Sequence, residues 1–207
     1  QVMKDDPRPY VLKNPICSPF SPVHAIICES TEDTNGWIER VDYAEGLFLQ
    51  EYLGKEEAGH FVFISGGEIC SLVTNQEYKR AFTGDMGPLA GAPLAGLAEQ
   101  DPTDQYGLAK ELIHPLRPWF EKTGYTGPLQ VTAIHKDGTW HAIEYNIRLG
   151  VTTTALLLRM LKNPIKVLIE VVKNQKPVPE WNTDRFFGCT LTLAGYGYPY
   201  IVPSVPK

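Results

Sequence analysis

Two turns, each placed between β-rich runs, constrain the fold of this chain more than any other sequence feature. The runs and turns are 60–65, Gly66-Gly67 and 68–74, followed later by 129–135, Lys136-Asp137-Gly138 and 140–149. Turns of this composition tolerate the positive φ angles that tight hairpin connections require. Because a tight turn reverses the chain, each pair of runs is predicted to form an antiparallel hairpin.

Shorter β-rich runs and helical patterns surround the two hairpins. Strands are predicted at 10–13, 25–28, 47–53 and 185–193, and helices at 31–43, 104–122, 153–161 and 164–174. Ser30 or Thr31 would cap the first helix, and Pro115 and Pro118 predict a kink or break in the second. Residues 84–96 are rich in Gly, Ala and Pro, which predicts a long loop. This order predicts an α+β fold, in which antiparallel sheets carry helices on one face.

Charge and cysteine content exclude several classes of partner. The 207 residues carry a formal charge of −5, so there is no overall attraction to nucleic acid or to an anionic membrane. No apolar run reaches the roughly 18 residues that a membrane helix needs. The four cysteines are far apart and lack metal-binding spacing, which is typical of free thiols in a reducing compartment. We therefore expect a cytoplasmic protein with no nucleic-acid and no membrane partner.

One strand carries a pattern that suits a metal and a phosphate. Glu144, Asn146 and Arg148 alternate along a predicted strand, and alternate residues share a face. Carboxylate and amide oxygens are hard ligands that Mg²⁺ prefers, while a guanidinium neutralises phosphate charge. The pattern is therefore a candidate Mg²⁺–phosphate platform. The alternative, which spacing alone favours, is the solvated face of an amphipathic strand.

Three further segments carry candidate binding groups. Lys13 ends the first predicted strand, and residues 50–53 followed by Glu56-Glu57 suit a hinge whose backbone meets a base edge and whose carboxylate meets a ribose. Residues 76–80 end in a basic pair and precede a loop at 84–88 that contains one aspartate. A basic pair followed by such a loop suits an anionic substrate that bears an amine. Each segment also has an ordinary interpretation, as an exposed lysine, a charged strand end and a surface turn.

Taken in order, these segments resemble the ATP-grasp core of the phosphoribosylamine–glycine ligase family. The family patterns and their positions are P-Y-V-x-K at 9–13, E-E-F-L at 50–53 with an acidic pair at 56–57, Q-D-H-K-R at 76–80, G-D-x-G-P at 84–88, and E-F-N-x-R-x-G at 144–150. Each match is weak alone, but five in the same order are fairly specific.

The resemblance implies an ATP-grasp fold with two lobes, 1–53 with the hinge and 54–207 with the metal strand. It also implies an ATP-dependent ligase of purine biosynthesis, which joins a glycine-like carboxylate to a phosphoribosylamine-like amine through an acyl phosphate. The family's amino-terminal domain is absent from this chain, so we expect it as a partner in cis or in trans.

The resemblance also implies a role for each matched residue. Glu144 and Asn146 would bind Mg²⁺, with Mn²⁺ as a substitute, and Lys13 would contact the ATP phosphates. The backbone of Glu51, Tyr52 and Leu53 would take adenine, and Glu57 the ribose. The residues expected to meet phosphates or the acceptor substrate are Lys79, Arg80, Asp85 and Arg148.

The chain departs from the family pattern at three functional segments, one of which is the family's G-P-N-T-G-G-M-G loop, here residues 87–94 with fewer polar donors. The family's glycine-rich flap, A-D-G-L-A-A-G-K-G, corresponds here to the proline-rich residues 14–22, with Ser21 where the second lysine would be. Losing a cation and several amide donors at a polyphosphate would cost several kcal/mol, at about 1.5–3 kcal/mol for each charge-assisted bond. The G-D-P-E after the metal strand becomes Gly150-Val151-Thr152-Thr153. These departures keep an alternative open, a degenerate ATP-grasp module that binds nucleotide weakly or supports a partner domain.

Overall fold

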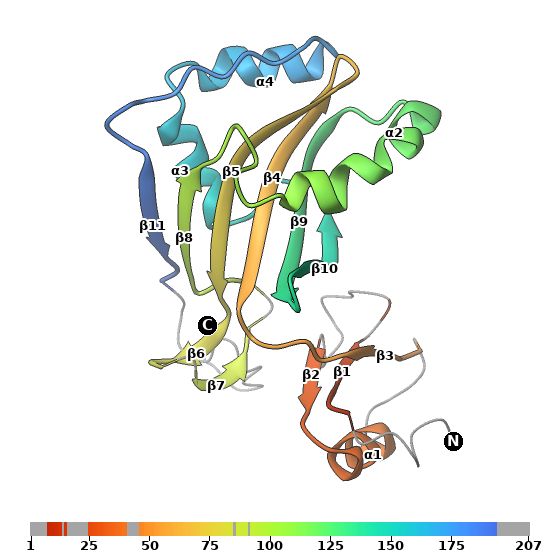
Figure 1. Cartoon of the computed structure of the whole chain (residues 1–207). Helices are drawn as coiled ribbons and strands as arrows, with labels where there is room; N and C mark the ends of the chain where they lie inside the picture. Colours follow the sequence, from red (N-terminus) through yellow and green to blue (C-terminus); the bar gives the residue numbers. More distant parts are fainter. Residues whose placement is uncertain are drawn as a thin grey trace, which may run out of the picture.

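A small antiparallel sheet forms near the start of the chain. The computed structural model describes residues 8–13, 15, 25–40, 46–84, 86–90 and 92–193 (Figure 1). In this sheet β1 (Tyr10–Lys13) lies between β2 (Ala25–Cys28) and β3 (Phe48–Glu51). Helix α1 (Thr31–Arg40) follows β2, and the amide of Asp33 donates to Ser30 Oγ at 3.0 Å. Ser30 is therefore the predicted helix cap.

A six-stranded antiparallel sheet holds both predicted hairpins. Its strand order is β10-β9-β4-β5-β8-β11. The strands are β4 (Glu57–Ser65), β5 (Glu68–Tyr78), β8 (Ala95–Gln100), β9 (Gly127–Lys136), β10 (Thr139–Asn146) and β11 (Phe187–Leu191). Gly66 and Gly67 join β4 to β5 with φ angles of 61° and 76°, and Asp137 and Gly138 join β9 to β10 with 53° and 78°. Both hairpins are confirmed.

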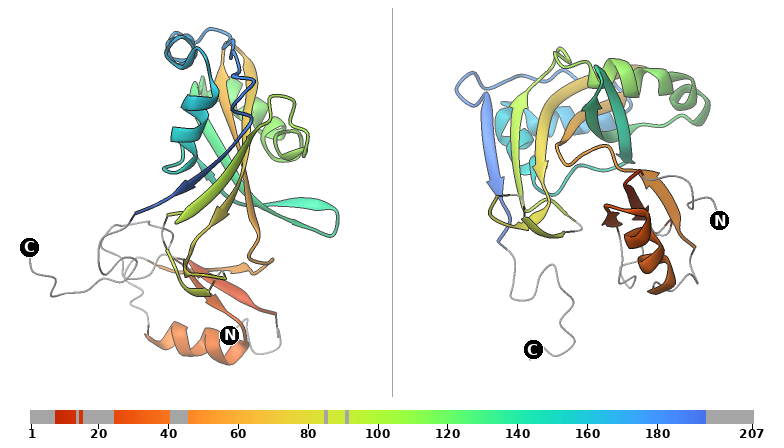
Figure 2. Two further views of the ribbon diagram at one scale, coloured as in Figure 1. Left: turned by 90° about the vertical axis from the view of Figure 1, so that its left-hand side faces the viewer. Right: turned by 60° about the horizontal axis from the view of Figure 1, so that its bottom comes forward.

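Helices cover both faces of the large sheet, whereas the sequence predicted one (Figure 2). On one face α3 (Thr153–Met160) and α4 (Pro164–Val172) pack with Phe61 and Phe63. On the other, a π-helical turn (Ala109–Ile113), a 3₁₀ turn (His114–Leu116) and α2 (Arg117–Thr123) pack with Val62 and Ile64. Residues 61–64 are all apolar, so β4 buries both of its faces. The α+β class itself is as predicted.

Two β-bulges change which residues share a face of this sheet. In β5, Phe61 pairs with Val73 but Val62 pairs with Ser71, so Leu72 is an extra residue. Leu72 and Val73 both enter the core beside α3 and α4. In β10, Ala142 pairs with Ala133 and Glu144 pairs with Thr132, which leaves one extra residue between them. Each bulge inverts the alternation of the residues that follow it.

The predicted loop at 84–96 contains regular structure instead. Strand β7 (Met86–Leu89) pairs with β6 (Arg80–Phe82), and β8 begins at Ala95. The sequence did not mark β7 and β8 because they contain glycine or proline, which disfavour strand interiors, and β6 has only three residues. The predicted break near Pro115 is confirmed by the change from π-helical to 3₁₀ to α-helical turns. No helix in the described part of the chain has the length and apolarity to cross a membrane.

Candidate functional site

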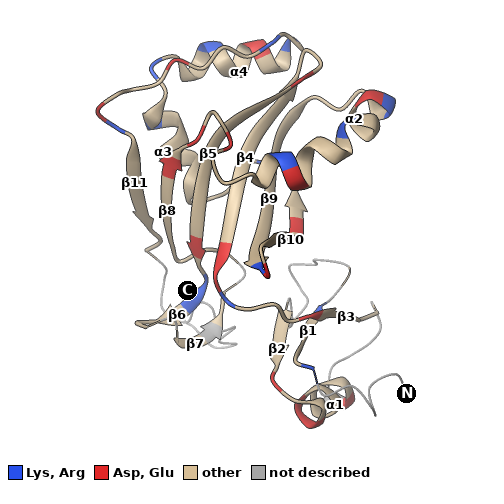
Figure 3. Cartoon of the chain, viewed as in Figure 1, with Lys and Arg blue, Asp and Glu red and all other residues tan. Residues whose placement is uncertain are grey.

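The sheet face beneath α3 and α4 becomes polar at the end nearest the small sheet. Strand pairing brings Glu57 opposite Glu77, and Gly59 opposite both Asn75 and Thr132. Thr132 is in turn paired with Glu144 on β10. Because paired residues of neighbouring strands share a face, the acidic side chains of β4, β5 and β10 lie together here. In Figure 3, acidic segments lie at the lower ends of β4 and β5, and another lies near the arrowhead of β10.

Lys79 lies at the centre of this acidic group. Its Nζ atom is 2.6 Å from Glu57 Oε2, 3.5 Å from Glu77 Oε2 and 3.9 Å from Glu144 Oε1, and only 14% of its side chain is exposed. Burial alone would lower the pKa of Lys79, but these carboxylates outweigh burial and raise the pKa above its ordinary value. The ammonium therefore stays charged and links three strands. We call these four residues the Lys79 cluster.

Two buried amide side chains support the cluster. Asn75 Nδ2 and Gln130 Nε2 both donate to Glu77 Oε1, at 3.1 and 2.8 Å. A Cβ atom on Gly59 would lie 2.5 Å from Asn75 Oδ1, so a larger residue here would displace the amides. Sequence reasoning gave no role to Asn75 or Gln130, and none to Glu77 although it lies in the matched segment 76–80. Polar residues inside otherwise apolar β-rich runs were the available signal.

Glu144 and Asn146 lie side by side, as their spacing predicted. Asn146 Nδ2 donates to Glu144 Oε1 at 3.2 Å, and the Glu144 side chain is 45% exposed. Strand β10 ends at Asn146, so strand alternation does not extend to Arg148. The Arg148 side chain is exposed and makes a long hydrogen bond of 3.5 Å to the carbonyl of Leu149. The structure thus groups Glu144 with Asn146 and leaves Arg148 apart.

The hinge residues lie where the small sheet meets the large one. Glu51 forms exposed ion pairs with Arg8 at 3.3 Å and with Lys136 of the large sheet at 3.9 Å. The amide of Tyr52 donates to the carbonyl of Pro9 at 3.1 Å. Leu53 follows in the same connection and is half-buried. None of these contacts reaches Lys79.

Of the remaining predicted residues, Lys13 lies in the small sheet and Arg80 in the β6–β7 hairpin. Lys13 is half-buried at the end of β1, where it pairs with Ala25 and Phe48. Arg80 Nη1 donates to the carbonyl of Gly87 at 2.8 Å, within the hairpin. Asp85 lies outside the described residues, as do 14 and 16–24 of the flap segment.

A cavity of about 470 Å³ lies against the large sheet. Its lining includes Ala58 and Gln76, which neighbour Glu57 and Glu77 along their strands, and Leu97, which pairs with Gln76; Glu57 of the cluster also reaches it. Alternate strand residues point to opposite faces. The cavity is therefore mainly on the other face of the sheet, and the Lys79 cluster is identified by its charges rather than by this hollow.

Comparisons with known proteins agree with the motifs. No protein-family model matches the chain. The phosphoribosylamine–glycine ligase of Ralstonia nicotianae is 28% identical over 206 residues, which cover 88% of this chain and 48% of that protein. The enzyme of the same name from Streptococcus pyogenes is 30% identical over 172 residues, 77% of this chain and 39% of that protein. The chain thus spans about half the length, or less, of the curated relatives it matches.

Solved structures give the same result for the fold. A phosphoribosylamine–glycine ligase from Thermotoga maritima superposes with a TM-score of 0.76 and 26% identity, over 96% of this chain and 52% of that one. The biotin carboxylase domain of a 2-oxoglutarate carboxylase from Hydrogenobacter thermophilus gives 0.61 with 16% identity, over 91% and 42% of the two chains, and supports the fold alone. The chain therefore has the ATP-grasp fold, and its similarity is to the ATP-grasp core of phosphoribosylamine–glycine ligases.

Proposed function

We propose that the chain binds Mg-ATP at the polar face around Lys79 and forms the ATP-grasp core of a carboxylate–amine ligase. One observation carries the proposal. Three separate motifs, the acidic pair before β4, the basic pair after β5 and the metal strand β10, supply Glu57, Lys79 and Glu144 to one cluster. Isolated surface charges have no reason to converge in this way.

The residues on β10 suit a hard divalent cation. The Glu144 carboxylate is partly exposed, and Asn146 donates through Nδ2, which leaves its carbonyl oxygen as a second donor. An all-oxygen set with open positions for water and phosphate is what Mg²⁺, or Mn²⁺ in its place, requires. When bound, such an ion neutralises charge on the ATP phosphates.

The proposed reaction has two steps. A carboxylate oxygen of a glycine-like substrate attacks the γ-phosphorus of ATP and ADP leaves, which gives an acyl phosphate. The amine of a phosphoribosylamine-like substrate then attacks the carbonyl carbon, and inorganic phosphate leaves. The chain contributes positioning and charge neutralisation. The names of the relatives support this substrate pair and a place in purine biosynthesis.

Each predicted residue has a place in this proposal. Lys13 and Lys79 would contact phosphates, the backbone of Glu51–Leu53 adenine, and Glu57 the ribose. Arg80, Asp85 and Arg148 would meet the acceptor substrate. The lobes would be 1–53 and 54–207, and an amino-terminal domain like that of the family, in cis or in trans, would complete the amine site. We expect this assembly in the cytoplasm.

Calorimetric titration with Mg-ATP tests the binding step. We expect measurable binding by the chain, and binding weakened by about tenfold or more in Glu144→Gln, because charge-assisted contacts contribute about 1.5–3 kcal/mol each. Glu121→Gln, an exposed change on α2, is the matched control and should bind as the parent does. A well-folded sample without Mg-ATP binding would contradict the proposal.

A second candidate is an ATP-grasp module that binds nucleotide without ligation. Two observations favour it: the Lys79 ammonium is already held by three carboxylates, and Gly150-Val151-Thr152-Thr153 lacks the carboxylates of the family pattern. ADP release that requires both glycine and an amine donor would support the ligase. Nucleotide binding with no ADP release across a panel of carboxylates would support the module.

A further inference from the structure

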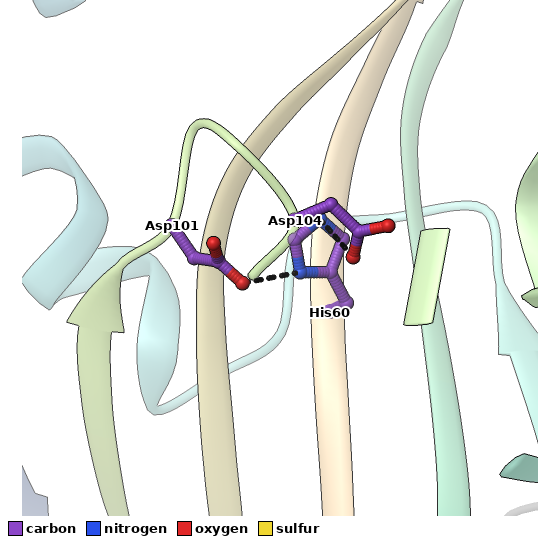
Figure 4. A group of neighbouring side chains, drawn as sticks. All are labelled: His60, Asp101 and Asp104. Carbon is purple, nitrogen blue, oxygen red and sulfur yellow. Dashed lines mark ion pairs between the residues drawn. The ribbon is translucent and has the colours of Figure 1, made fainter. Parts of the chain in front are cut away.

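A second buried polar group lies on the opposite face of β4 from the Lys79 cluster. His60 follows Gly59 on β4 and is fully buried, with 0% of its surface exposed. Its ring lies between the carboxylates of Asp101 and Asp104, which belong to the loop after β8 (Figure 4). We call His60, Thr74, Asp101 and Asp104 the His60 cluster. It shares no residue with the proposed ATP site.

One side of the His60 ring is fixed by a relay of hydrogen bonds. Thr74 Oγ1 donates to Asp101 Oδ2 at 2.7 Å, and His60 Nδ1 lies 2.8 Å from the same hydroxyl oxygen. A hydroxyl has one hydrogen to donate, so it accepts from His60, and Nδ1 carries the ring hydrogen. The neutral ring therefore presents a lone pair at Nε2.

The other side of the ring faces a carboxylate across a gap. His60 Nε2 is buried and has no hydrogen-bond partner, and Asp104 Oδ1 lies 4.0 Å away. That separation exceeds the roughly 2.7–3.2 Å of a hydrogen bond. Two metal–ligand bonds of about 2.0–2.1 Å each span up to about 4 Å. A lone pair and an anionic oxygen at this distance suit a cation between them better than a shared proton.

The Asp104 carboxylate is held in place by the loop. It accepts from the amides of Ala109 and Lys110 at 2.9 and 2.7 Å, and its backbone has a φ of 54°. The side chain is 11% exposed, which gives solvent access to this edge of the cluster. Among the described residues, no lysine or arginine forms an ion pair with either aspartate.

We propose that His60 Nε2 and Asp104 Oδ1 bind a divalent transition-metal ion such as Zn²⁺, with water completing its coordination. Nitrogen and carboxylate donors together suit such ions. The Thr74–Asp101 relay orients the His60 ring, as carboxylates commonly do for metal-bound histidines. A tetrahedral ion needs its two donor atoms about 3.3 Å apart, so the Asp104 carboxylate would move toward His60 Nε2 by less than about 1 Å.

Zinc titration of the chelator-treated chain tests the proposal through His60 itself. In a sample with ¹⁵N-labelled histidine, we expect Zn²⁺ to change the ¹⁵N chemical shift of His60 Nε2. The shift should move from that of an unprotonated ring nitrogen to that of a metal-bound one. Competition with a chromophoric chelator gives the affinity. His60→Gln and Asp104→Asn should each weaken Zn²⁺ binding by more than about tenfold.

Two matched variants control for loss of a histidine or an aspartate elsewhere. His135→Gln removes an exposed histidine, and Asp137→Asn changes an exposed aspartate whose φ of 53° matches that of Asp104. Both should keep the affinity of the parent. A His60 Nε2 resonance that does not respond to saturating Zn²⁺, or that shows a retained proton, would overturn the proposal. So would unchanged affinity in a folded His60→Gln protein; if that variant does not fold, the resonance of the parent decides.

Discussion

The Lys79 cluster and the His60 cluster lie on opposite faces of the same two strands, and they balance their charges differently. Around Lys79, the chain supplies both the carboxylates and the cation that holds them. Around His60, it supplies two carboxylates and a neutral ring with one unpartnered nitrogen. The Lys79 cluster therefore already contains one internal cation, with Glu144 partly exposed for the proposed Mg²⁺, whereas the His60 cluster contains no cation of its own.

The strongest test of this contrast is Lys79→Met. Removing the cation leaves three carboxylates without compensation, so we expect the free energy of unfolding to fall by about 3 kcal/mol. Lys122→Met, at an exposed position on α2, is the matched control and should change little. Denaturant unfolding measures both, and equal losses in the two variants would contradict the contrast.

The difference in unfolding free energy between the parent and Lys79→Met has a defined pH dependence. The pKa of Lys79 in the folded chain is raised above its unfolded value, so its contribution is fully present below the unfolded pKa. The difference between parent and Lys79→Met should therefore be constant at neutral pH. It should be lost only in alkaline solution, as the pH rises through the folded pKa of Lys79.

Gly59→Ala tests whether the two faces are independent. The new Cβ would clash with Asn75 Oδ1 and press on Gln130 Nε2, so we expect a loss of about 2 kcal/mol from overpacking. The disturbance should stay on the Lys79 face and leave the ¹⁵N resonances of His60 unchanged. Gly36→Ala, in the open middle of α1, is the control and should stabilise the chain by about 0.5–1 kcal/mol.

Two threonines allow the same change to be made on each face. Thr74→Val breaks the relay and leaves His60 Nδ1 and Asp101 Oδ2 without their partner, for an expected loss of about 1.5 kcal/mol. Thr132→Val, on the Lys79 face, removes a buried hydroxyl that has no hydrogen-bond partner. It should be neutral or slightly stabilising. If both variants lost the same stability, the relay would have no special role.

The smallest expected effect is a difference in cysteine reactivity. It concerns the sheet face that carries the Lys79 cluster, at the end that α3 and α4 cover. Cys70 packs against the core beneath α3 and α4, and burial raises its pKa to about 11. Since the thiolate is the reactive form, alkylation at pH 8 should modify exposed Cys189 at least about tenfold faster than Cys70. Peptide mapping over time measures the two rates. Comparable rates would show that the helices leave this face open.

Local chemistry made the hairpins and the pairing of Glu144 with Asn146 predictable from the sequence. Gly66-Gly67 and Asp137-Gly138 specify their turns directly, while β7 was missed because it contains glycine and proline, and β6 because it has only three residues. The His60 cluster was not predictable in this way. His60 and Asp101 are brought together by strand pairing across more than 40 residues, and no local pattern marks either one as a ligand.

The bulge in β5 decides on which face of the sheet each following side chain of that strand lies. If β5 alternated regularly from Cys70 onward, Thr74 would lie on the face of the Lys79 cluster and Glu77 on the face of His60. The extra residue in β10 likewise decides on which face of the sheet the Glu144 side chain lies. An insertion or deletion of one residue near either position would therefore move the following side chains of that strand to the opposite face of the sheet and take them out of their cluster.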